Sequence, residues 1–551
     1  MKKNQRIFLY ITSFLAGLSI MAVEIGASRL LAPFFSSSQI VWTIIIGVIM
    51  IAMALGNFLG GKLADKRPDP KYLFFRLIIA ATWVALIPLV GKYIITGIAL
   101  LFALIIKSNY LIISAFFACL ILFGFPLMLL GTTTPSLTRY CISTHEESGK
   151  IVGTISALNT VGSIIGTFTP TFLTIPYLGT AGSFLLFAGI LLVLSITYFI
   201  IYFVEQKKEG GPKPPKKEIV TDSITTSVCI LLFILSSIFG SRGRVAFWDK
   251  TILYEGESLY NYLRVYESEN GDIHLSTHVL IGVQSTKFKN EGLRNHYHDY
   301  ALVANYLVEP MDGKLDILTL GLGTGTYPSQ QYHYFKDSVN VTGVEIDGKI
   351  VDLAYEFFEL PEEVETHVDD GRHFLVNGAG KNKKYDIILC DAYQDITIPF
   401  HMATKEFFKI TKDHLEPNGV VIINMNMFSD KPGSINDYLC DTAALHFKSL
   451  YSVVAASNKL LFASDNENMI SLADQQISNE PNVYVQNFMS LVLPKLEVYT
   501  PGNYILTDDK SPVELLGMRI IDDIIQEELE YYRKLLREKG LKGLLESLLS
   551  V

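Results

Sequence analysis

The sequence predicts a chain of two parts, a multi-pass α-helical membrane domain followed by an α/β domain built on a parallel sheet. The first observation is that 49% of the 551 residues are hydrophobic, which is too apolar for an ordinary soluble protein. The second is that these residues are unevenly spread. Up to about Gly240 they form long uncharged runs, and beyond it charged and apolar residues alternate as in a globular domain. The third is a series of short apolar runs after residue 314, separated by segments of helical spacing, which is typical of a parallel sheet covered on both faces.

The helical part contains seven runs that approach the roughly 20 apolar residues needed to span a bilayer. These runs are Ile7–Ala27, Ile40–Leu59, Leu77–Val90, Leu111–Leu130, Ile151–Leu173, Ser183–Val204 and Ile224–Phe239. An eighth run, Ile94–Ile106, is only about a dozen residues long, so it is expected to be re-entrant or interfacial unless it crosses as well. We therefore expect a multi-pass protein of the cell membrane with seven or eight spans, for which the lipid bilayer is a partner.

Basic residues set the expected orientation of these helices. The N-terminus carries Lys2, Lys3 and Arg6, which place it in the cytoplasm by the positive-inside rule. The loop Gly61–Lys71, two spans later, is also basic, as parity requires. The linker Glu205–Glu218 is rich in Lys, Pro and Gly and is expected to be a flexible cytoplasmic tether. Seven crossings then put the rest of the chain outside the cell, whereas an eighth puts this linker outside, so both alternatives stay open.

These features divide the chain into four expected segments. They are a transmembrane helical domain (1–204), a basic linker with the last transmembrane helix (205–241), a small β-rich domain (242–310) and an α/β domain (311–551). The final stretch, Asp522–Leu549, has the pattern of a charged amphipathic helix, which is most simply a packing surface or a homo-oligomer contact.

Alternating apolar and polar residues predict the β-rich segment. Thr251–Ser268 and Asp272–Thr286 are rich in β-branched and aromatic side chains, which indicates strands of a small antiparallel sheet. His296–Val308 has helical spacing. Strands of the parallel sheet follow as "LDILTLGLG", "VNVTGVEID", "YDIILCDAY" and "GVVIINM". Ligands of such sheets bind at the carboxyl ends of the strands, where the strand order reverses.

Net charge and cysteine usage argue against several functions. A net charge of −9 argues against a nucleic-acid partner, because a phosphate-binding surface needs a basic excess. The five cysteines are scattered and odd in number, and none are paired at the spacing of a metal site or a disulfide framework. We therefore expect no metal.

A glycine-rich turn after the first parallel strand carries the main functional prediction. Gly321, Gly323 and Gly325 let the backbone turn tightly and approach a ligand, as in a Rossmann-like domain of the class I methyltransferase type. The turn alone is weak evidence, because a tight strand-to-helix turn also needs glycine for structural reasons. Glu345 ends the next strand about 20 residues on, where a carboxylate can take both hydroxyls of a ribose. Asp370 follows the third strand position and can accept from an adenine amino group, so the three features predict a nucleoside site.

From about Ile252 to Met425 the chain resembles the spermidine synthase (polyamine aminopropyltransferase) family. The motifs that carry the resemblance are "LYEGESLYNYLRV", "GVQS", "YHD", the glycine turn, "VEID", "DDGR", "DIILCDAY" and "TKEFF", in the order of the family. The whole chain, with "EIGASRLLAPFF" near its start and "TDDKSPVE" near its end, resembles membrane-fused members that join a major-facilitator-like half to a synthase-like half.

The resemblance implies transfer of an aminopropyl group from decarboxylated S-adenosylmethionine to a di- or polyamine. The residues that it assigns to the adenosyl co-substrate are Gln284, Gly321, Gly323, Thr324, Gly325, Glu345, Asp370 and Asp391. It assigns the acceptor amine to Tyr297, His298 and Asp299. It assigns catalysis to Asp391 and Asp395. Because adenosyl cofactors are made in the cytoplasm, the α/β domain is expected to face it.

Three positions depart from the family pattern. Thr324 stands where the family has an aspartate that pairs with the aminopropyl ammonium. Asp391 matches the first acid of the family's Asp-x-x-Asp pair, whereas Gln394 occupies the second position and Asp395 lies one residue later. Asp299 replaces a glutamate.

Two other functions stay open. Intact S-adenosylmethionine carries a carboxylate that an aspartate at position 324 would repel, so Thr324 fits a methyltransferase. The third alternative is a transporter or sensor that binds a nucleoside or polyamine without turnover.

His401 belongs either to a solvated loop or to a proton-transfer site. Asp508, Asp509 and Glu514 form either a solvated acidic loop or part of a polyamine groove.

Overall fold

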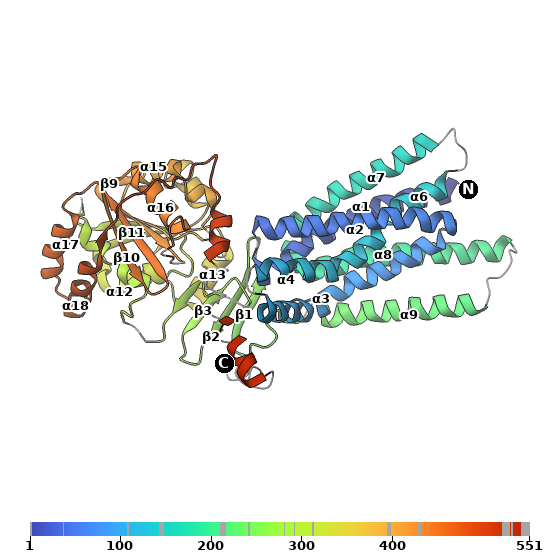
Figure 1. Cartoon of the computed structure of the whole chain (residues 1–551), viewed down its shortest axis with the longest axis horizontal. Helices are drawn as coiled ribbons and strands as arrows, with labels where there is room; N and C mark the ends of the chain where they lie inside the picture. Colours follow the sequence, from blue (N-terminus) through green and yellow to red (C-terminus); the bar gives the residue numbers. More distant parts are fainter. Residues whose placement is uncertain are drawn as a thin grey trace. The chain divides into compact units, whose positions relative to one another are not determined.

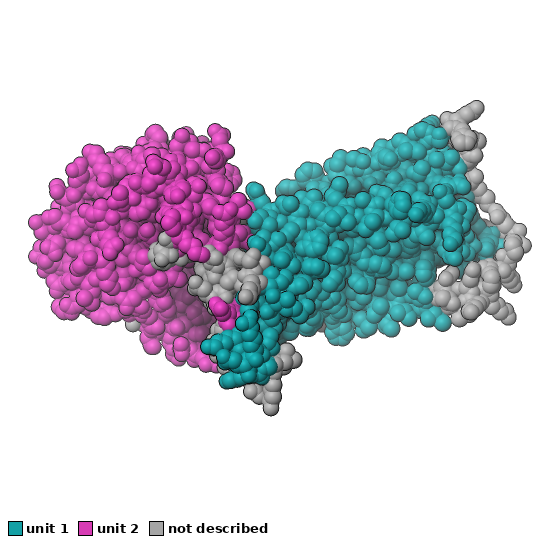
Figure 2. Space-filling model, in the orientation of Figure 1, with its two compact units in different colours: residues 1–248, 532–551 teal, residues 249–531 magenta. Residues whose placement is uncertain are grey.

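The structure is a computed structural model of the chain, and the chain divides into two compact units, coloured separately in Figure 2. Unit 1 comprises Met1–Trp248 with Tyr532–Val551, and unit 2 comprises Asp249–Tyr531. The four segments expected from the sequence stay a prediction, and most of the expected helix Asp522–Leu549 lies outside the described residues. The described residues are 3–36, 38–106, 109–142, 148–209, 216–240, 243–279, 282–290, 292–310, 313–393, 398–426, 429, 431–520, 529–530 and 533–540.

Unit 1 is built from α-helices (Figure 1). The helices before residue 249 are α1 (Lys3–Phe35), α2 (Gln39–Lys66), α3 (Lys71–Ile105), α4 (Tyr110–Cys119), α5 (Phe125–Gly131), α6 (Thr133–Cys141), α7 (Ser148–Thr169), α8 (Ile175–Glu209) and α9 (Lys216–Phe239). The π-helical turns Leu120–Gly124 and Pro170–Thr174 lead from α4 into α5 and from α7 into α8. Within the described residues five continuous helices are long and apolar enough to cross a membrane, and Ser223–Phe239 is a shorter apolar helix.

One of these five helices, which covers Ser148–Gln206, contains a break. Gly179 has a φ of 71° there, a left-handed backbone that glycine adopts without strain, so two arms meet at this residue. Counting the two arms separately, the described part of unit 1 holds seven apolar helical segments.

The run Ile94–Ile106 does not form the separate re-entrant or interfacial segment expected from the sequence. α3 continues without interruption through Leu77–Val90 and on to Ile105, so both runs belong to one helix. Two residues near the junction of the runs disfavour a helix, Pro88 and Gly91, which cost about 3 and about 1 kcal/mol relative to alanine. Both are buried in α3, and the helix continues through them with apolar residues on both sides.

Contacts between α1 and α8 show that these helices run in opposite directions. Near the start of α1, Gln5 Nε2 donates to Glu205 Oε2 at 2.8 Å. Farther along α1, a Cβ added at Gly26 would lie 2.9 Å from the Phe184 ring. The start of α1 and the end of α8 therefore lie at the same end of the bundle.

α3 and α9 run in the same direction as α1. The Phe8 and Phe74 rings lie 5.7 Å apart, so α3 begins at the end where α1 begins. The Ser236 hydroxyl of α9 donates to a carbonyl in the middle of α3, and beyond α9 the Arg244 carbonyl accepts from Lys92 Nζ at 2.6 Å. α9 therefore ends at the opposite end of the bundle from residue 3.

Unit 2 begins with the small antiparallel sheet that the sequence predicts. Its order is β1-β2-β3-β4, and neighbouring strands are antiparallel. The strands are β1 (Ile252–Glu257), β2 (Tyr262–Glu267), β3 (Ile273–Ser276) and β4 (Ser285–Lys287).

The second sheet of unit 2 has eight strands in the order β12-β10-β11-β9-β8-β5-β6-β7. They are β5 (Leu315–Leu320), β6 (Val339–Glu345), β7 (Glu365–Val368), β8 (Tyr385–Cys390), β9 (Leu415–Met425), β10 (Ser449–Ala455), β11 (Asn458–Ser464) and β12 (Glu497–Val498). The four strands predicted from the sequence are parallel, which confirms the Rossmann-like fold. An antiparallel hairpin, β10 and β11, extends the sheet and was not predicted.

Helices cover both faces of this sheet (Figure 1). Successive residues of a strand face opposite sides, so Ile317 and Leu389 belong to one core and Leu318 and Ile388 to the other. The helices are α10 (Tyr297–Ala301), α11 (Ala304–Leu307), α12 (Thr326–Phe335), α13 (Gly348–Phe357), α14 (Gly371–Val376), α15 (Lys405–Asp413), α16 (Ile435–Ala444), α17 (Met469–Ser478) and α18 (Val483–Val492), with 3-10 turns at Lys336–Ser338, Phe400–Met402 and Leu493–Lys495. The strand order reverses between β5 and β8, which is where ligands of such sheets bind.

Candidate active site

A cavity of about 270 Å³ lies in unit 2 at the carboxyl ends of β5, β6 and β8. Residues predicted from the sequence that line it are Gln284, Tyr297, His298, Gly321, Gly323, Glu345, Asp370 and Asp391. Three others, Asp299, Thr324 and Gly325, do not line it, and Asp395 lies outside the described residues. The structure thus brings together residues that are more than 100 positions apart in the sequence.

The glycine turn follows β5 directly and needs glycine at two points. Gly321 has a φ of 89°, and a Cβ there would lie 2.4 Å from the Asp391 carbonyl oxygen. Gly325 has a φ of 82°, and a Cβ there would lie 2.3 Å from Leu360 Cδ1. Any other residue would be strained at both positions, so these two glycines set the path of the turn beside the cavity.

Glu345 ends β6 and its carboxylate holds the glycine turn in place through a backbone amide. Its Oε2 accepts from the Gly323 amide at 2.9 Å, and its Oε1 accepts from the Asp347 amide at 3.1 Å. The side chain is buried, and this burial raises its pKa to about 7 despite the two backbone donors. Each carboxylate oxygen keeps a lone pair for a ligand hydroxyl.

Asp370 caps α14 and pairs with His401, which comes from a later part of the chain. Its side chain accepts from the His373 amide at 2.9 Å, and its Oδ2 lies 2.7 Å from His401 Nε2. Burial alone would raise the pKa of Asp370, but the hydrogen bonds from His401 and from two backbone amides outweigh it and lower the pKa. His401 lines the cavity, so this pair belongs to the site.

Asp391 follows β8 and is held by two neutral side chains. Its Oδ2 accepts from the Tyr297 hydroxyl and its Oδ1 from Asn424 Nδ2, both at 2.7 Å. Burial raises its pKa to about 6, which the two donors only partly offset. Asn424 was not predicted from the sequence. The available signal was an amide in the apolar second half of β9, residues 420–425, where a buried polar group needs a partner.

His298 lies beside this acid as a neutral ring. It stacks on Tyr297 with ring centroids 3.8 Å apart, and its Nδ1 atom is buried without a hydrogen-bond partner in the described residues. Burial lowers its pKa to about 3. The ring therefore presents no positive charge to the cavity at neutral pH.

Asp299 and Thr324 occupy buried positions outside the cavity lining. The Asp299 carboxylate accepts from the Arg294 and His296 amides at 2.7 and 2.9 Å and from Gln330 Nε2 at 2.6 Å, so it closes the first turn of α10. Thr324 is 1% exposed, its hydroxyl oxygen has no partner among the described residues, and it lines a second cavity of about 330 Å³.

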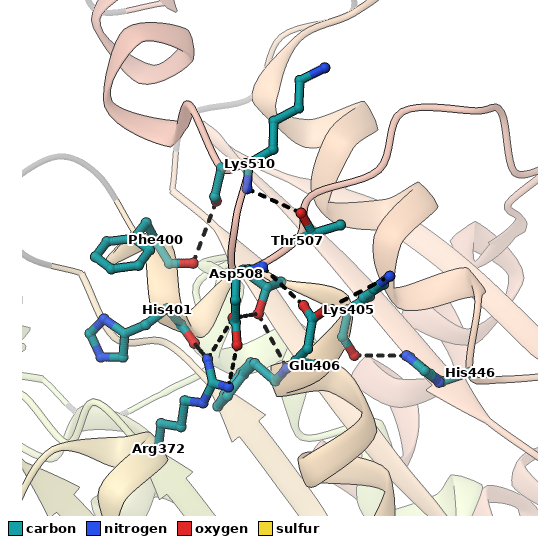
Figure 3. Close-up of polar contacts among 12 residues, drawn as sticks. Arg372, Phe400, His401, Lys405, Glu406, His446, Thr507, Asp508 and Lys510 are labelled. Carbon is teal, nitrogen blue, oxygen red and sulfur yellow. Dashed lines mark hydrogen bonds and ion pairs between the residues drawn. The ribbon is translucent and has the colours of Figure 1, made fainter.

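Asp508 is ion-paired rather than placed in the cavity lining. Both of its carboxylate oxygens accept from the Arg372 guanidinium, at 2.8 and 2.7 Å (Figure 3). Arg372 was not predicted from the sequence, because the two partners are 136 residues apart and no local spacing connects them. Among the described residues, no group of three or more His, Cys, Asp or Glu side chains is placed to hold a metal ion.

Comparison with known proteins identifies the family of the chain. Residues 317–456 match the family described as the spermine/spermidine synthase domain. The chain is 42% identical over 339 residues to the probable polyamine aminopropyl transferase of Bifidobacterium longum, covering 58% of this chain and 74% of that protein. It is 32% identical over 288 residues to the polyamine aminopropyltransferase of Vibrio vulnificus, covering 49% and 92%. A solved structure of a probable spermidine synthase from Corynebacterium glutamicum matches with 18% identity and a TM-score of 0.34, covering 45% of this chain and 97% of that one.

These relationships define a transferase with a Rossmann-like domain. The chain belongs to the polyamine aminopropyltransferase family.

Proposed function

We propose that unit 2 transfers an aminopropyl group from decarboxylated S-adenosylmethionine to a di- or polyamine, and that unit 1 anchors it in a membrane. The acidic lining of the cavity is the observation that carries this proposal. Among the described residues four carboxylates line it, and neither Lys nor Arg does. These carboxylates belong to Glu345, Asp369, Asp370 and Asp391. Both reactants are cations, a sulfonium and an alkylammonium, and a cavity of this charge attracts them.

The adenosyl group fits the half of the cavity that contains Glu345 and Asp370. Ionised Glu345 would accept from the ribose hydroxyls while it keeps its two backbone donors. The pair of Asp370 and His401 would hold the edge of the base. We keep Gln284 in this half, because it lines the cavity next to β4.

The acceptor amine fits the half that contains Asp391 and Tyr297. The amine nitrogen attacks the propyl carbon beside the sulfonium, the carbon–sulfur bond breaks, and methylthioadenosine leaves with that electron pair. The attacking nitrogen must lose a proton, and Asp391, with a pKa raised to about 6, is placed to accept it. Asp395 is a second candidate for this proton from the sequence and lies outside the described residues. Asp299 would position Tyr297 by capping the helix that carries it.

The release of methylthioadenosine by the purified full chain tests this proposal. With decarboxylated S-adenosylmethionine and a diamine, we expect methylthioadenosine and one aminopropylated amine in equal amounts. No methylthioadenosine with any diamine or polyamine, together with a methylated amine from intact S-adenosylmethionine, would replace the proposal with a methyltransferase.

A methyltransferase is the second candidate, and Thr324 favours it. No carboxylate stands at this position to repel the carboxylate of intact S-adenosylmethionine. The same assay with both co-substrates decides between the two, because the by-products differ. A protein that binds polyamine but releases neither by-product would be the non-catalytic sensor or transporter.

The membrane proposal for unit 1 is supported by its exposed apolar surface. Large exposed apolar patches mark surfaces that are covered in the working protein, and lipid covers the faces of a multi-pass bundle. Side chains that are more than 60% exposed include Met50, Phe58, Phe172 and Val193, which belong to α2, α8, and the π turn before α8.

The seven apolar helical segments of the described part of unit 1 are an odd number, so the chain leaves the bundle at the end opposite its N-terminus. α9 ends opposite the start of α1, and Arg533, which follows unit 2 in the chain, donates to the Ala103 carbonyl at 2.9 Å near the end of α3. Both connections to unit 2 are therefore at the end opposite the basic N-terminus and the basic loop Gly61–Lys71. By the positive-inside rule, we propose that unit 2 faces away from the cytoplasm, which requires that the adenosyl co-substrate, made in the cytoplasm, reaches it across the membrane. The cytoplasmic placement expected from the sequence needs an even number of crossings.

Cysteine labelling in intact cells tests this sidedness. The five native cysteines are buried, so an impermeant maleimide reports on an introduced cysteine. We expect labelling of Leu491→Cys, on an exposed position of α18, and none of Lys66→Cys at the end of α2. The reverse pattern would place unit 2 in the cytoplasm, and labelling of neither or both would contradict a single fixed orientation.

A further inference from the structure

Arg372 connects three parts of unit 2 that the proposed reaction does not otherwise link. It is the second residue of α14, two positions after Asp370. Its Nη1 donates to the His401 carbonyl at 3.0 Å and to Asp508 Oδ1 at 2.8 Å, and its Nη2 donates to Asp508 Oδ2 at 2.7 Å (Figure 3). The pair is bidentate, a geometry that fixes orientation as well as distance.

Asp508 is itself fixed to α15. The Thr404 hydroxyl donates to its Oδ1 at 2.7 Å. The Asp508 amide donates to Glu406 Oε2 at 3.0 Å (Figure 3). The hydrogen bonds from Arg372 lower the pKa of Asp508 to about 2, so it is ionised across the physiological range. Thr507 and Lys510 exchange two backbone hydrogen bonds, which closes the turn that presents Asp508.

His401 is consequently held at two points. Its backbone carbonyl accepts from Arg372, and its ring Nε2 lies 2.7 Å from Asp370 Oδ2. Asp370, His401 and Met402 line the cavity, whereas Arg372 and Asp508 do not. The ion pair therefore acts on the site only through His401 and Asp370.

We propose that Arg372 and Asp508 form a positioning pair that sets the adenosyl half of the cavity by fixing His401 against Asp370. The inference rests on the proposed function, because it assumes that this half binds the adenosyl group. Removing Arg372 takes away the donor to the His401 carbonyl, and removing Asp508 leaves the Arg372 guanidinium without the carboxylate that orients it, so in both cases His401 is held less firmly beside the base. The acceptor half keeps its contacts, since Asp391 is held by Tyr297 and Asn424.

Binding and kinetics of the full-length purified chain test the proposal. Arg372→Met and Asp508→Asn should each weaken methylthioadenosine binding by about tenfold, the loss of one hydrogen bond to a charged group. The KM for decarboxylated S-adenosylmethionine should rise by a similar factor, and kcat at saturating co-substrate should stay within twofold. A purely structural role would lower kcat and the folded fraction together. The matched control is Lys409→Met, which removes a 2.7 Å ion pair on the exposed face of α15 and should change neither constant.

Exchange of the two partners sharpens the test. Arg372→Asp combined with Asp508→Arg should recover part of the affinity that each single reversal loses, because the pair is exposed enough to accept either orientation. If the wild-type chain binds methylthioadenosine and both Arg372→Met and Asp508→Asn bind it within twofold of the wild-type affinity, this inference is overturned and the proposed function is not. A wild-type chain that binds no methylthioadenosine would overturn the proposed function and this inference with it.

Discussion

The adenosyl half and the acceptor half of the cavity hold their carboxylates in different ways. In the adenosyl half, Glu345 and Asp370 accept from backbone amides, Glu345 from its own turn and from the glycine turn after β5, and Asp370 from the first turn of α14. In the acceptor half, Asp391 accepts from two side chains, Tyr297 and Asn424, which come from distant parts of the chain. The first arrangement follows from the path of the backbone, whereas the second depends on which side chains are present. Substitutions of Tyr297 or Asn424 therefore leave the backbone hydrogen bonds of the adenosyl half in place.

The largest effect is expected in the acceptor half. Asp391→Asn keeps the shape of the side chain but removes the proton acceptor, so turnover should fall by roughly 10²–10⁴-fold, the usual contribution of a general base. Methylthioadenosine affinity should change little, because the adenosyl half is untouched. Steady-state kinetics and calorimetry measure the two quantities, with Asp474→Asn on the exposed side of α17 as the control. Turnover within tenfold of wild type would move the base to Asp395.

The second effect is expected in the adenosyl half and should be a loss of binding. Glu345→Ala removes hydrogen bonds to the ribose, each worth roughly 1.5–3 kcal/mol when one partner is charged. It also frees the Gly323 amide, which Glu345 now accepts from at 2.9 Å. Calorimetry should show most of the methylthioadenosine affinity gone. Unchanged affinity would remove the nucleoside assignment, and Glu345→Gln shows how much of the loss comes from charge.

The difference between the two halves also decides which parts of the site the sequence could predict. Gly321, Gly325 and Glu345 were found because a strand followed by a tight turn requires glycine, and because a strand end fixes the next acid. Asn424 was missed because its role depends on a partner 33 residues away. Asp299 was assigned to the substrate, although in the structure its oxygens accept from the start of its own helix. Strand ends and turns predict the residues that follow them, including Asp391, whereas the distant side chain that pairs with such a residue, here Asn424, is not predicted by local spacing.

The fold shows the same division. The parallel strands were predicted from apolar runs that need both faces covered, and they pair as expected. The hairpin of β10 and β11 was missed because no glycine marks its turn. Ala456 adopts the left-handed conformation there, with a φ of 56°. In unit 1, apolar length predicted where helices occur but not that α3 continues through two apolar runs.

Methylthioadenosine binding and turnover should depend on pH in different ways in the two halves of the cavity, with smaller effects than those of the two substitutions above. In the ligand-free protein the pKa of Glu345 is raised to about 7, and ribose hydroxyls favour its ionised form, so methylthioadenosine binding should tighten as pH rises from 6 to 8. The pKa of Glu345 is higher in the folded chain than in the unfolded chain. Its contribution to the free energy of unfolding is therefore fully present at pH values below the pKa of the unfolded chain, and it is lost as pH rises through about 7. Turnover at saturating substrates should rise through about pH 6, where Asp391 ionises.

Two variants assign these pH effects. Glu345→Gln should make binding nearly independent of pH between 6 and 8 and should remove the loss of stability over that range. It should leave the rise of turnover near pH 6 in place. A binding profile that keeps its slope in Glu345→Gln would show that another group controls the adenosyl half.

The smallest effect is expected at Thr324, where the family has an aspartate. A unit charge about 4 Å from the ligand cation is worth up to roughly 4 kcal/mol at an effective dielectric of 20, before desolvation is subtracted. Thr324 is 1% exposed and does not line the main cavity, so burial of a carboxylate there offsets most of this attraction. We expect Thr324→Asp to shift the preference toward decarboxylated over intact S-adenosylmethionine by only roughly two- to tenfold. It should also lower the melting temperature.

Competition binding of the two co-substrates to wild type, Thr324→Asp and the uncharged control Thr324→Asn measures this shift. A wild type that prefers the intact form, together with a reversal in Thr324→Asp, would put the methyltransferase reading ahead. A wild type that already prefers the decarboxylated form would mean that another acid supplies the missing charge, and Asp391 is the acid that lines the acceptor half. The same ratio in all three proteins would show that the Thr324 side chain faces the second cavity rather than the co-substrate.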